Sequence, residues 1–293
     1  MIKNAYALLR ARGIGGLLQE VRHRVLPEQL AYYPRCKPLL ESLVGLEIGG
    51  PSSVFGPRGY VPVYPIAARI DNCNFGSHTV WEGDINEGQT FVFDQSKPPG
   101  RQFVAEAADL RHIEDAAYDF VLSSHCIEHL ANPLQGLREW IRVLKTDGLL
   151  VLLVPHKDGT FDHRRPVTSM EHLLQDFAAG ATEHDSTHLE EILRLHDLSQ
   201  DPGAGTFEQF RERSLRNFEN RCLHQHVFDT RLALEVVDHA RLQILAVELF
   251  RPCHIVVIAQ KPGPDRAVDN AKFTSETASW RSPFPSDRTP GHG

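Results

Sequence analysis

The chain has 293 residues, of which 41% are hydrophobic and 24% charged, and its net charge is -7. This length allows one large domain with its own core, or two small ones. The acidic balance gives no overall basic bias toward a nucleic-acid backbone. No apolar run approaches the ~20 residues that a transmembrane helix needs. We therefore expect no stable membrane insertion.

The first 26 residues are basic, but arginine and glycine interrupt their apolar positions, so they do not predict a signal peptide. We expect residues 1–40 to form an N-terminal helical segment that packs on the protein, in preference to a membrane-surface helix. The cysteines stand far apart and form no C-x-x-C pair. A reduced, cytoplasmic setting without disulfides is the simplest interpretation.

The middle of the chain alternates strand and helix signals. Apolar runs predict buried strands at 43–49, 102–107, 118–124 and 149–155. A further strand is expected at 60–64, where Pro62 favours an edge or irregular position.

A helix is predicted to begin at Asn132-Pro133, an N-cap residue followed by proline at the first helical position. Residues 230–240 have helical spacing, and 242–250 and 254–260 read as two strands joined by a short turn. The expected fold class is therefore α/β, with a Rossmann-like, mostly parallel sheet and an antiparallel hairpin at its C-terminal edge.

Residues 156–229 are far longer than the ~2–6 residues that usually connect a strand to a helix in such a fold. Segments 169–180 and 187–198 have helical spacing, so we expect an inserted helical lid within a domain spanning 41–261. The lid should cover the carboxyl-terminal edge of the sheet, where open α/β folds bind ligands. The tail, 262–293, lacks apolar periodicity and is expected to be mobile.

The stretch "YDFVLSSHCIEHLANPLQGLREWIRVLKTDGLLVLLVP", residues 118–155, carries a family resemblance. It resembles the fourth strand, "LEH" turn, "RVLKPGG" helix end and fifth strand of the class I S-adenosylmethionine-dependent methyltransferases, in their small-molecule branch. The resemblance covers 41–155 well and 230–260 by strand pattern only. In the insertion, "TFDHRRPVT" and "HQHVF" look like features of a bacterial subgroup. The resemblance implies S-adenosylmethionine as cofactor and O- or N-methylation of a small or sugar-like acceptor.

The resemblance also assigns roles in the loop after the first strand. Glu47 falls on the family's acid, which orients the loop or the methionine amino group; Gly49 falls on the first loop glycine, and Gly50 follows it. Pro51 and Ser53 stand where the family usually has glycines. Proline cannot adopt a positive φ and lacks an N–H donor, so the loop must follow a different path.

Five further positions are assigned to the rest of the cofactor and its cleft. Asp71 is the nearest acid to the second strand that would bind the ribose hydroxyls. Glu106 falls on the acid near the adenine amino group and Ala107 offers its N–H to the ring, with Asp109 as the competing acid. Two residues after the fourth strand should line the floor of the cleft: Ser124 and His125.

Methyl transfer requires in-line alignment of donor and acceptor, and a hydroxyl acceptor benefits from a base. Ionisable residues gather after the fifth strand, and His163 is the first choice as base because imidazole titrates near neutral pH. The expected catalytic set is His163, Asp162 and His156. The expected substrate-binding set, suited to an acidic group, is Lys157, Arg164, Arg165, His224 and His226.

His224 and His226 raise a second possibility, because residues i and i+2 of a strand share a face as a metal pair would. A third ligand would have to come from far away, from His163 or Asp229. We therefore predict no metal.

Two alternatives remain beside the enzyme. The departures at Pro51 and Ser53 would suit a non-catalytic methyltransferase-like domain, whereas a dinucleotide oxidoreductase needs a G-x-G-x-x-G that "GGPSSVFG" does not supply. We expect a cytoplasmic protein with a small-molecule substrate and no nucleic-acid partner. The sequence leaves the acceptor, the methylated atom and a homo-oligomer open.

Overall fold

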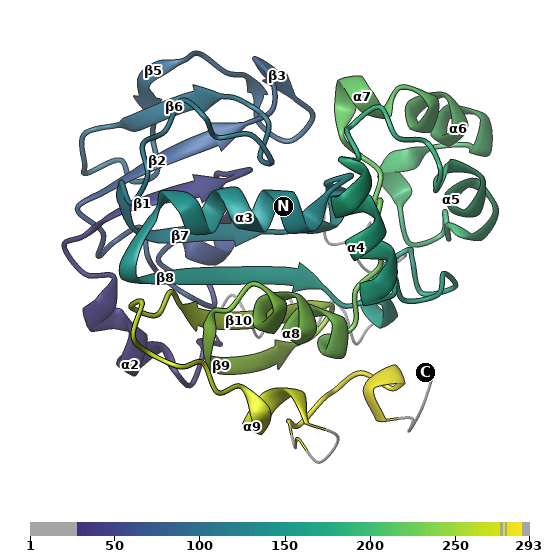
Figure 1. Cartoon of the computed structure of the whole chain (residues 1–293). Coiled ribbons are helices and arrows are strands. Elements are labelled where there is room, and N and C mark those ends of the chain that lie inside the picture. Colours follow the sequence, from purple (N-terminus) through teal and green to yellow (C-terminus); the bar gives the residue numbers. More distant parts are fainter. Residues whose placement is uncertain (1–27, 276–277, 279, 289–293) are drawn as a thin grey trace.

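The computed structural model describes residues 28–275, 278 and 280–288. The helices expected before residue 27 lie outside these residues. An eight-stranded sheet runs through the molecule in the order β5-β6-β2-β1-β7-β8-β10-β9 (Figure 1). Its strands are β1 (Val44–Ile48), β2 (Arg69–Asn74), β5 (Gly88–Phe91), β6 (Gly100–Val104), β7 (Tyr118–Ser124), β8 (Leu144–Pro155), β9 (Gln243–Phe250) and β10 (His254–Gln260).

The sheet has the predicted mixed character. Strands β6, β2, β1, β7 and β8 pair in parallel, β10 is antiparallel to β8, and β9 is antiparallel to β10. The expected C-terminal hairpin is therefore confirmed. Strand β5 adds an antiparallel edge beside β6, and β3 (His78–Thr79) pairs with β4 (Gly83–Asp84) in a separate hairpin; the sequence predicted none of these three.

The strand expected at 60–64 is wrong, because this segment turns instead of extending. The backbone N–H groups of Val63 and Tyr64 both donate to the Phe55 carbonyl at 2.9 Å, which folds the segment back on the short 3-10 helix Ser53–Phe55. The second parallel strand comes later, at β2. No helix longer than one turn separates β1 from β2 among the residues that the structure describes.

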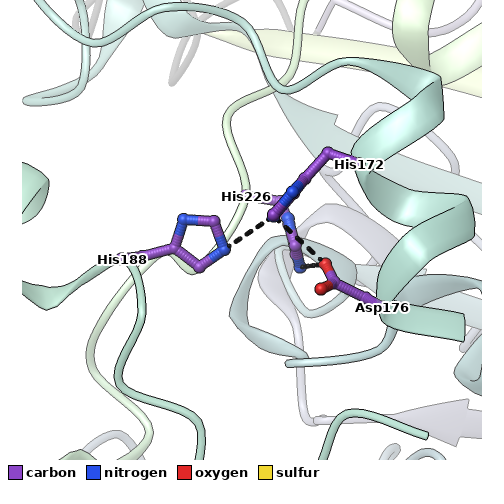
Figure 2. Close-up of side chains that lie close together, drawn as sticks. All are labelled: His172, Asp176, His188 and His226. Carbon is purple, nitrogen blue, oxygen red and sulfur yellow. Dashed lines mark hydrogen bonds and ion pairs between the residues drawn. The ribbon is translucent and has the colours of Figure 1, made fainter. Parts of the chain in front are cut away.

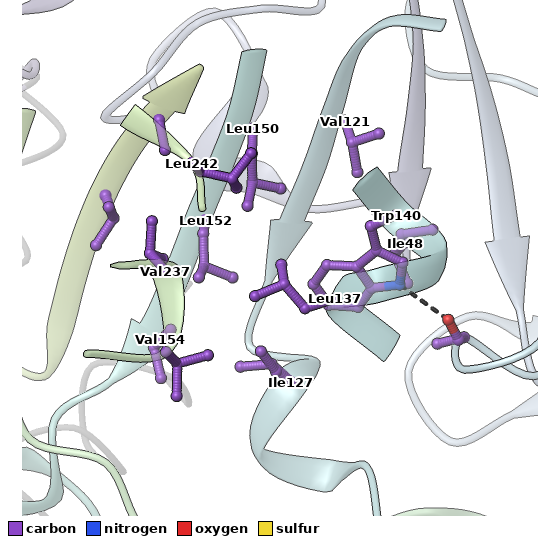
Figure 3. Packing of buried hydrophobic residues seen from close by; sticks show 14 of the residues in the cluster. Ile48, Val121, Ile127, Leu137, Trp140, Leu150, Leu152, Val154, Val237 and Leu242 are labelled. Carbon is purple, nitrogen blue, oxygen red and sulfur yellow. Dashed lines mark hydrogen bonds between the residues drawn. The ribbon is translucent and has the colours of Figure 1, made fainter. Parts of the chain in front are cut away.

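One face of the sheet is covered by two helices, α3 (Pro133–Val143) and α8 (Thr230–His239) (Figure 1). The Asn132 side chain caps α3 by accepting the Gln135 N–H at 3.0 Å, as the Asn-Pro pair predicted. Trp140 of α3 is fully buried, and its indole N–H donates to the Ala107 carbonyl at 2.9 Å (Figure 3). This bond ties α3 to the loop that follows β6.

The other face is covered by short elements and loops. They are α2 (Tyr33–Cys36), the 3-10 helix Lys37–Leu39 and the 52–67 segment. Phe55 and Val63 of this segment pack in one cluster with Phe120 and Val151 of the sheet. The sheet is thus buried on both faces, as its near-continuous apolar strands require.

The insertion stands beyond the carboxyl ends of β7 and β8, as predicted (Figure 1). Its elements are the 3-10 helices Lys157–Gly159 and Pro202–Ala204 with α4 (Met170–Ala179), α5 (Leu189–Leu195), α6 (Phe207–Leu215) and α7 (Asn217–Asn220). The two helices expected at 169–180 and 187–198 are confirmed as α4 and α5. Among the described residues, no helix combines the length and apolar character needed to cross a bilayer.

The described part of the tail packs on the domain. It contains α9 (Ala271–Thr274) and a 3-10 turn at Ser286–Arg288. Phe284 is buried and stacks on His156 with ring centroids 4.0 Å apart, and Asp287 accepts a hydrogen bond from His156 Nε2 at 3.1 Å. Side-chain contacts of this kind have no signature in apolar periodicity.

Trp140→Ala should lower the free energy of unfolding by about 3–5 kcal/mol, because it leaves a cavity in the core and an unpaired Ala107 carbonyl. Urea denaturation followed by circular dichroism measures the change. Trp81→Ala is the matched control, since Trp81 is 46% exposed. A loss for Trp140→Ala no greater than that of the control would contradict this description of the core.

Candidate active site

A cavity of about 430 Å³ opens at the carboxyl ends of the parallel strands, between the sheet and the insertion. Its sheet side is lined by Gly49, Pro51, Ser52, Cys73, Phe75, Glu106, Ala107, Ser124, His125 and Cys126. Its insertion side is lined by Phe161, Asp201, Arg213, Arg221, Cys222 and His224. Six of these residues are ones that the sequence proposed: Gly49, Glu106, Ala107, Ser124, His125 and His224.

The loop after β1 is organised around the carboxylate of Glu47, which is 1% exposed. This carboxylate accepts hydrogen bonds from the Ser52 N–H at 2.9 Å and from the Tyr64 hydroxyl at 2.7 Å. Burial raises the pKa of Glu47 to about 8 against the opposing effect of these two bonds. The acid therefore orients the loop, one of the two roles that the family resemblance implied.

Gly50 is needed because its Cα approaches that carboxylate closely. A Cβ at this position would lie 2.3 Å from the Glu47 Cδ atom. The peptide groups of Gly50 are held by β2: its N–H donates to Asn72 Oδ1 at 3.0 Å, and its carbonyl accepts from the Asn72 and Asn74 amides at 3.2 and 3.0 Å. Side-chain amides thus fix a loop that has Pro51 in place of a later glycine.

Asp71 does not line the cavity, because it lies in the middle of β2 and not at its end. It is 3% exposed, and its carboxylate accepts from the Arg101 N–H at 2.8 Å and the Tyr118 hydroxyl at 2.9 Å. The sequence placed the second strand too early, so the acid expected to follow that strand lies within β2 instead. The strand leads into the cavity at Cys73 and Phe75.

Glu106 meets the insertion across the cavity. Its carboxylate pairs with the guanidinium of Arg221, which also lies 5.0 Å from the centre of the Phe75 ring. Ala107 follows with its carbonyl directed to Trp140. The adenine-side residues that the resemblance assigned are therefore together, and an arginine of the insertion, which the sequence did not single out, joins them.

His125 has a positive φ of 52° at the end of β7, a strained conformation for a residue with a Cβ. Its Nε2 lies 2.9 Å from Nδ1 of His254. Burial, together with the nearby imidazole groups, lowers the pKa of His125 well below its usual value. His125 is thus a neutral hydrogen-bonding group in the cavity wall.

Asp162 and His224 form a buried pair at the cavity. The Asp162 carboxylate hydrogen-bonds to Nδ1 of His224 and accepts from the Arg165 guanidinium at 3.0 Å. Burial opposes both charges, but their mutual attraction prevails: the pKa of His224 is raised and that of Asp162 lowered. Arg165 also donates to the carbonyls of His224 and Gln225 at 2.7 and 3.1 Å, which fixes this part of the insertion.

Glu128, which sequence reasoning missed, lies beside this pair. Its carboxylate is 1% exposed, has no hydrogen-bond partner among the described residues, and has its pKa raised to about 7 by burial. Its Oε1 lies 3.9 Å from His125 Nδ1, 3.7 Å from His129 Nε2 and 3.9 Å from His224 Nε2. In the sequence, only its place as the acid of the "LEH"-like turn could have indicated Glu128 as a site residue.

The other residues expected to do chemistry lie away from the cavity. His163 Nε2 and Arg164 both bind Asp197, at 2.8 and 3.1 Å, on the outer side of the insertion. His156 is fully buried against the tail, and the Lys157 ammonium donates to the Arg165 carbonyl. The position of these residues after a strand predicted that their segment lies at this edge of the sheet. It did not predict where their side chains point.

His224 and His226 do not share a face, because residues 224–226 do not form a strand. His224 turns to the cavity, whereas His226 lies near His172, His188 and Asp176 of the insertion. A shared metal pair was one possible interpretation of this sequence, and the structure rules out that pairing.

Residues 67–152, from β2 to β8, match the family model described as "Methyltransferase domain". This part of the chain is therefore similar to a methyltransferase domain. The cavity lies at the carboxyl ends of the parallel strands, where open α/β sheets bind their ligands. No curated protein matches the sequence.

Solved structures of similar fold are distant. A SAM-dependent methyltransferase from Aquifex aeolicus is 12% identical with a TM-score of 0.41, covering 82% of this chain and 97% of its own. One from Mesorhizobium loti is 12% identical with a TM-score of 0.43, covering 79% and 98%. The 1,6-didemethyltoxoflavin-N1-methyltransferase of Burkholderia thailandensis, with bound S-adenosylhomocysteine, is 13% identical with a TM-score of 0.43, covering 89% and 90%.

Gly50→Ala should weaken binding of S-adenosylhomocysteine by at least about tenfold, because the added methyl group displaces the Glu47 carboxylate that positions the Ser52 N–H. Calorimetric titration measures the affinity. Gly203→Ala is the matched control, since a Cβ there meets only Asp201 Oδ1 at 3.5 Å. Equal affinities of the two variants would contradict the role given to Gly50.

Glu47→Gln tests the buried carboxyl itself. A folded-state pKa of about 8, above the unfolded value, means that Glu47 contributes stability that is present at acidic pH and lost as pH rises through 8. Glutamine keeps the acceptor oxygen without this titration. The free energy of unfolding should therefore fall less between pH 5 and pH 8 in the variant than in the wild type, and parallel curves would count against the raised pKa.

Proposed function

We propose that this methyltransferase transfers the methyl group of S-adenosylmethionine to a hydroxyl of a small polar acceptor, with His224 as the general base. The observation that carries the proposal is that His224 lines the cavity while its Nδ1 is hydrogen-bonded to the buried Asp162 carboxylate. A carboxylate bound to Nδ1 fixes the ring and leaves Nε2 free to act on a substrate.

The sheet side of the cavity suits the cofactor. The loop at Gly49 and Ser52 would receive the methionine portion, and Glu106 with the Ala107 backbone would face the adenine. When bound, S-adenosylmethionine supplies an electrophilic methyl carbon on a positively charged sulfur. Glu106 would be able to hydrogen-bond to the adenine ring if the ion pair between Arg221 and Glu106 broke. A rotation of the long Arg221 side chain is enough to break it.

The insertion side suits the acceptor. Arg213 binds Asp201 at 2.9 Å through Nη2, and its buried Nε has no hydrogen-bond partner among the described residues. Arg213 and Arg221 both line the cavity, and a carboxylate or phosphate of the acceptor would replace the Asp201 and Glu106 carboxylates that pair with them in the absence of substrate. A sugar-like acid or a sugar phosphate has this chemistry.

In its neutral form, His224 would take the hydroxyl proton of the acceptor on Nε2, and its raised pKa favours the imidazolium that this transfer forms. Asp162 stabilises the imidazolium that forms, and Arg165 keeps Asp162 in place. An amine acceptor would need this base less, so N-methylation is the alternative that the same cavity allows.

His224→Ala should lower kcat by about 10²–10⁴-fold, the usual effect of removing a general base, while affinity for S-adenosylhomocysteine changes by less than about threefold. The assay follows tritiated methyl transfer from S-adenosylmethionine to a panel of hydroxylated sugars, sugar acids and sugar phosphates. His163→Ala is the matched control, because His163 binds Asp197 outside the cavity.

The two variants distinguish His224, the base that the structure favours, from His163, the base that the sequence alone favoured. Loss of turnover in His163→Ala with retention in His224→Ala would reverse the assignment of the base. Absence of any cofactor binding by the wild type would instead favour a non-catalytic domain.

A further inference from the structure

Four side chains of the insertion converge on one point outside the cavity (Figure 2). His172 and Asp176 stand one turn apart on the same face of α4, His188 precedes α5, and His226 comes from the segment before α8. One ligand atom from each lies within 4.8 Å of all the others. None of the four lines the cavity of the proposed active site.

We propose that His172, Asp176, His188 and His226 together bind one divalent transition-metal ion, with zinc as the expected ion. Three imidazoles and one carboxylate form a donor set that zinc accepts, and four protein ligands give a closed structural site, not an open catalytic one. The proposal is independent of the choice of acceptor and of catalytic base.

The spacing of the ligand atoms fits such an ion. His172 Nε2 lies 3.1 Å from His188 Nε2 and 3.3 Å from Asp176 Oδ2, and a ring nitrogen of His226 lies within 4.8 Å of the other three ligand atoms. Ligands placed about 2.0–2.2 Å from a tetrahedral zinc are about 3.3–3.6 Å from one another. Small side-chain rotations therefore suffice to close the four groups around an ion.

Unpaired polar atoms give a second, independent reason. Asp176 Oδ2 and His226 Nδ1 are buried without a hydrogen-bond partner among the described residues, although buried polar atoms are normally paired. His226 Nε2 faces the Ala131 carbonyl at 3.4 Å, an arrangement that places its proton there and leaves the Nδ1 lone pair available. A cation at the centre would satisfy both orphaned atoms.

The nearest fixed positive charge does not oppose a metal ion. Arg165 contributes to the electrostatic environment of His188 and His226, but its guanidinium is paired with Asp162 at 3.0 Å and Glu191 at 2.8 Å. These two neighbouring carboxylates therefore compensate the charge of Arg165. The Asp176 carboxylate is not needed for that and can bind the ion.

A bound ion would fasten the insertion to the wall of the cavity. It would join α4, the start of α5 and the segment containing His226, whose N–H already donates to the Glu128 carbonyl at 3.1 Å. His224 lies two residues before His226, so the same ion would restrict the position of the proposed base. We therefore expect the metal to stabilise the insertion without touching substrate.

The test uses the full chain, stripped of metal with a chelator and then titrated with Zn²⁺ or with Co²⁺. The proposal predicts one ion bound per chain, the intense visible absorption of tetrahedral Co²⁺, and a melting temperature raised by about 5 °C or more with zinc. Wild-type protein that binds no stoichiometric ion, or shows only six-coordinate Co²⁺, would overturn it.

Ligand variants locate the ion. His188→Ala and Asp176→Asn should each weaken Zn²⁺ binding by at least about tenfold. The matched control in the same insertion is His184→Ala, since His184 stacks on Phe218. Binding unchanged in both ligand variants would overturn the assignment, and if a variant does not fold, the wild-type stoichiometry and Co²⁺ spectrum decide.

Discussion

The buried carboxylate of Glu47 is the interaction on which the cofactor side of this molecule depends. It accepts hydrogen bonds from both the Ser52 N–H and the Tyr64 hydroxyl, and it leaves no room for a side chain at residue 50. Methyltransferases commonly shape this loop with several glycines; here Asn72 and Asn74 of the neighbouring strand bind its peptide groups instead. The loss of later glycines therefore changes the means of holding the loop and not its position at the end of β1.

The insertion depends in the same way on Arg165, whose side chain is fully buried. Its guanidinium binds Asp162, Glu191 and the carbonyls of residues 224 and 225, so it links three separate parts of the insertion. A buried ion pair of this kind adds little net stability over an apolar core, but it sets geometry closely. That geometry directs His224 toward the cavity.

Much of the fold could be predicted because apolar periodicity reports burial directly. The strand at 118–124 and the helices that became α4 and α5 were identified in this way, and Asn132-Pro133 marked the start of α3. The strand expected at 60–64 failed because its apolar side chains are buried in a turn. Burial and extension are separate properties, and periodicity measures only the first.

The site was harder to predict, because side-chain direction is decided by contacts distant in sequence. His163 follows a strand end, yet it turns outward to Asp197, and Asp71 is an acid near the right strand that faces other partners. The metal-ligand cluster combines residues up to 54 positions apart, of which only the His172–Asp176 pair on one helix had a recognisable spacing.

A crystal structure of the protein with S-adenosylhomocysteine is the measurement that tests the account most directly. We expect the homocysteine portion on the loop at Gly49 and Ser52, the adenine beside Glu106, and the open side of the sulfur facing Nε2 of His224. A ligand bound elsewhere, or a sulfur whose open side faces away from His224, would contradict it.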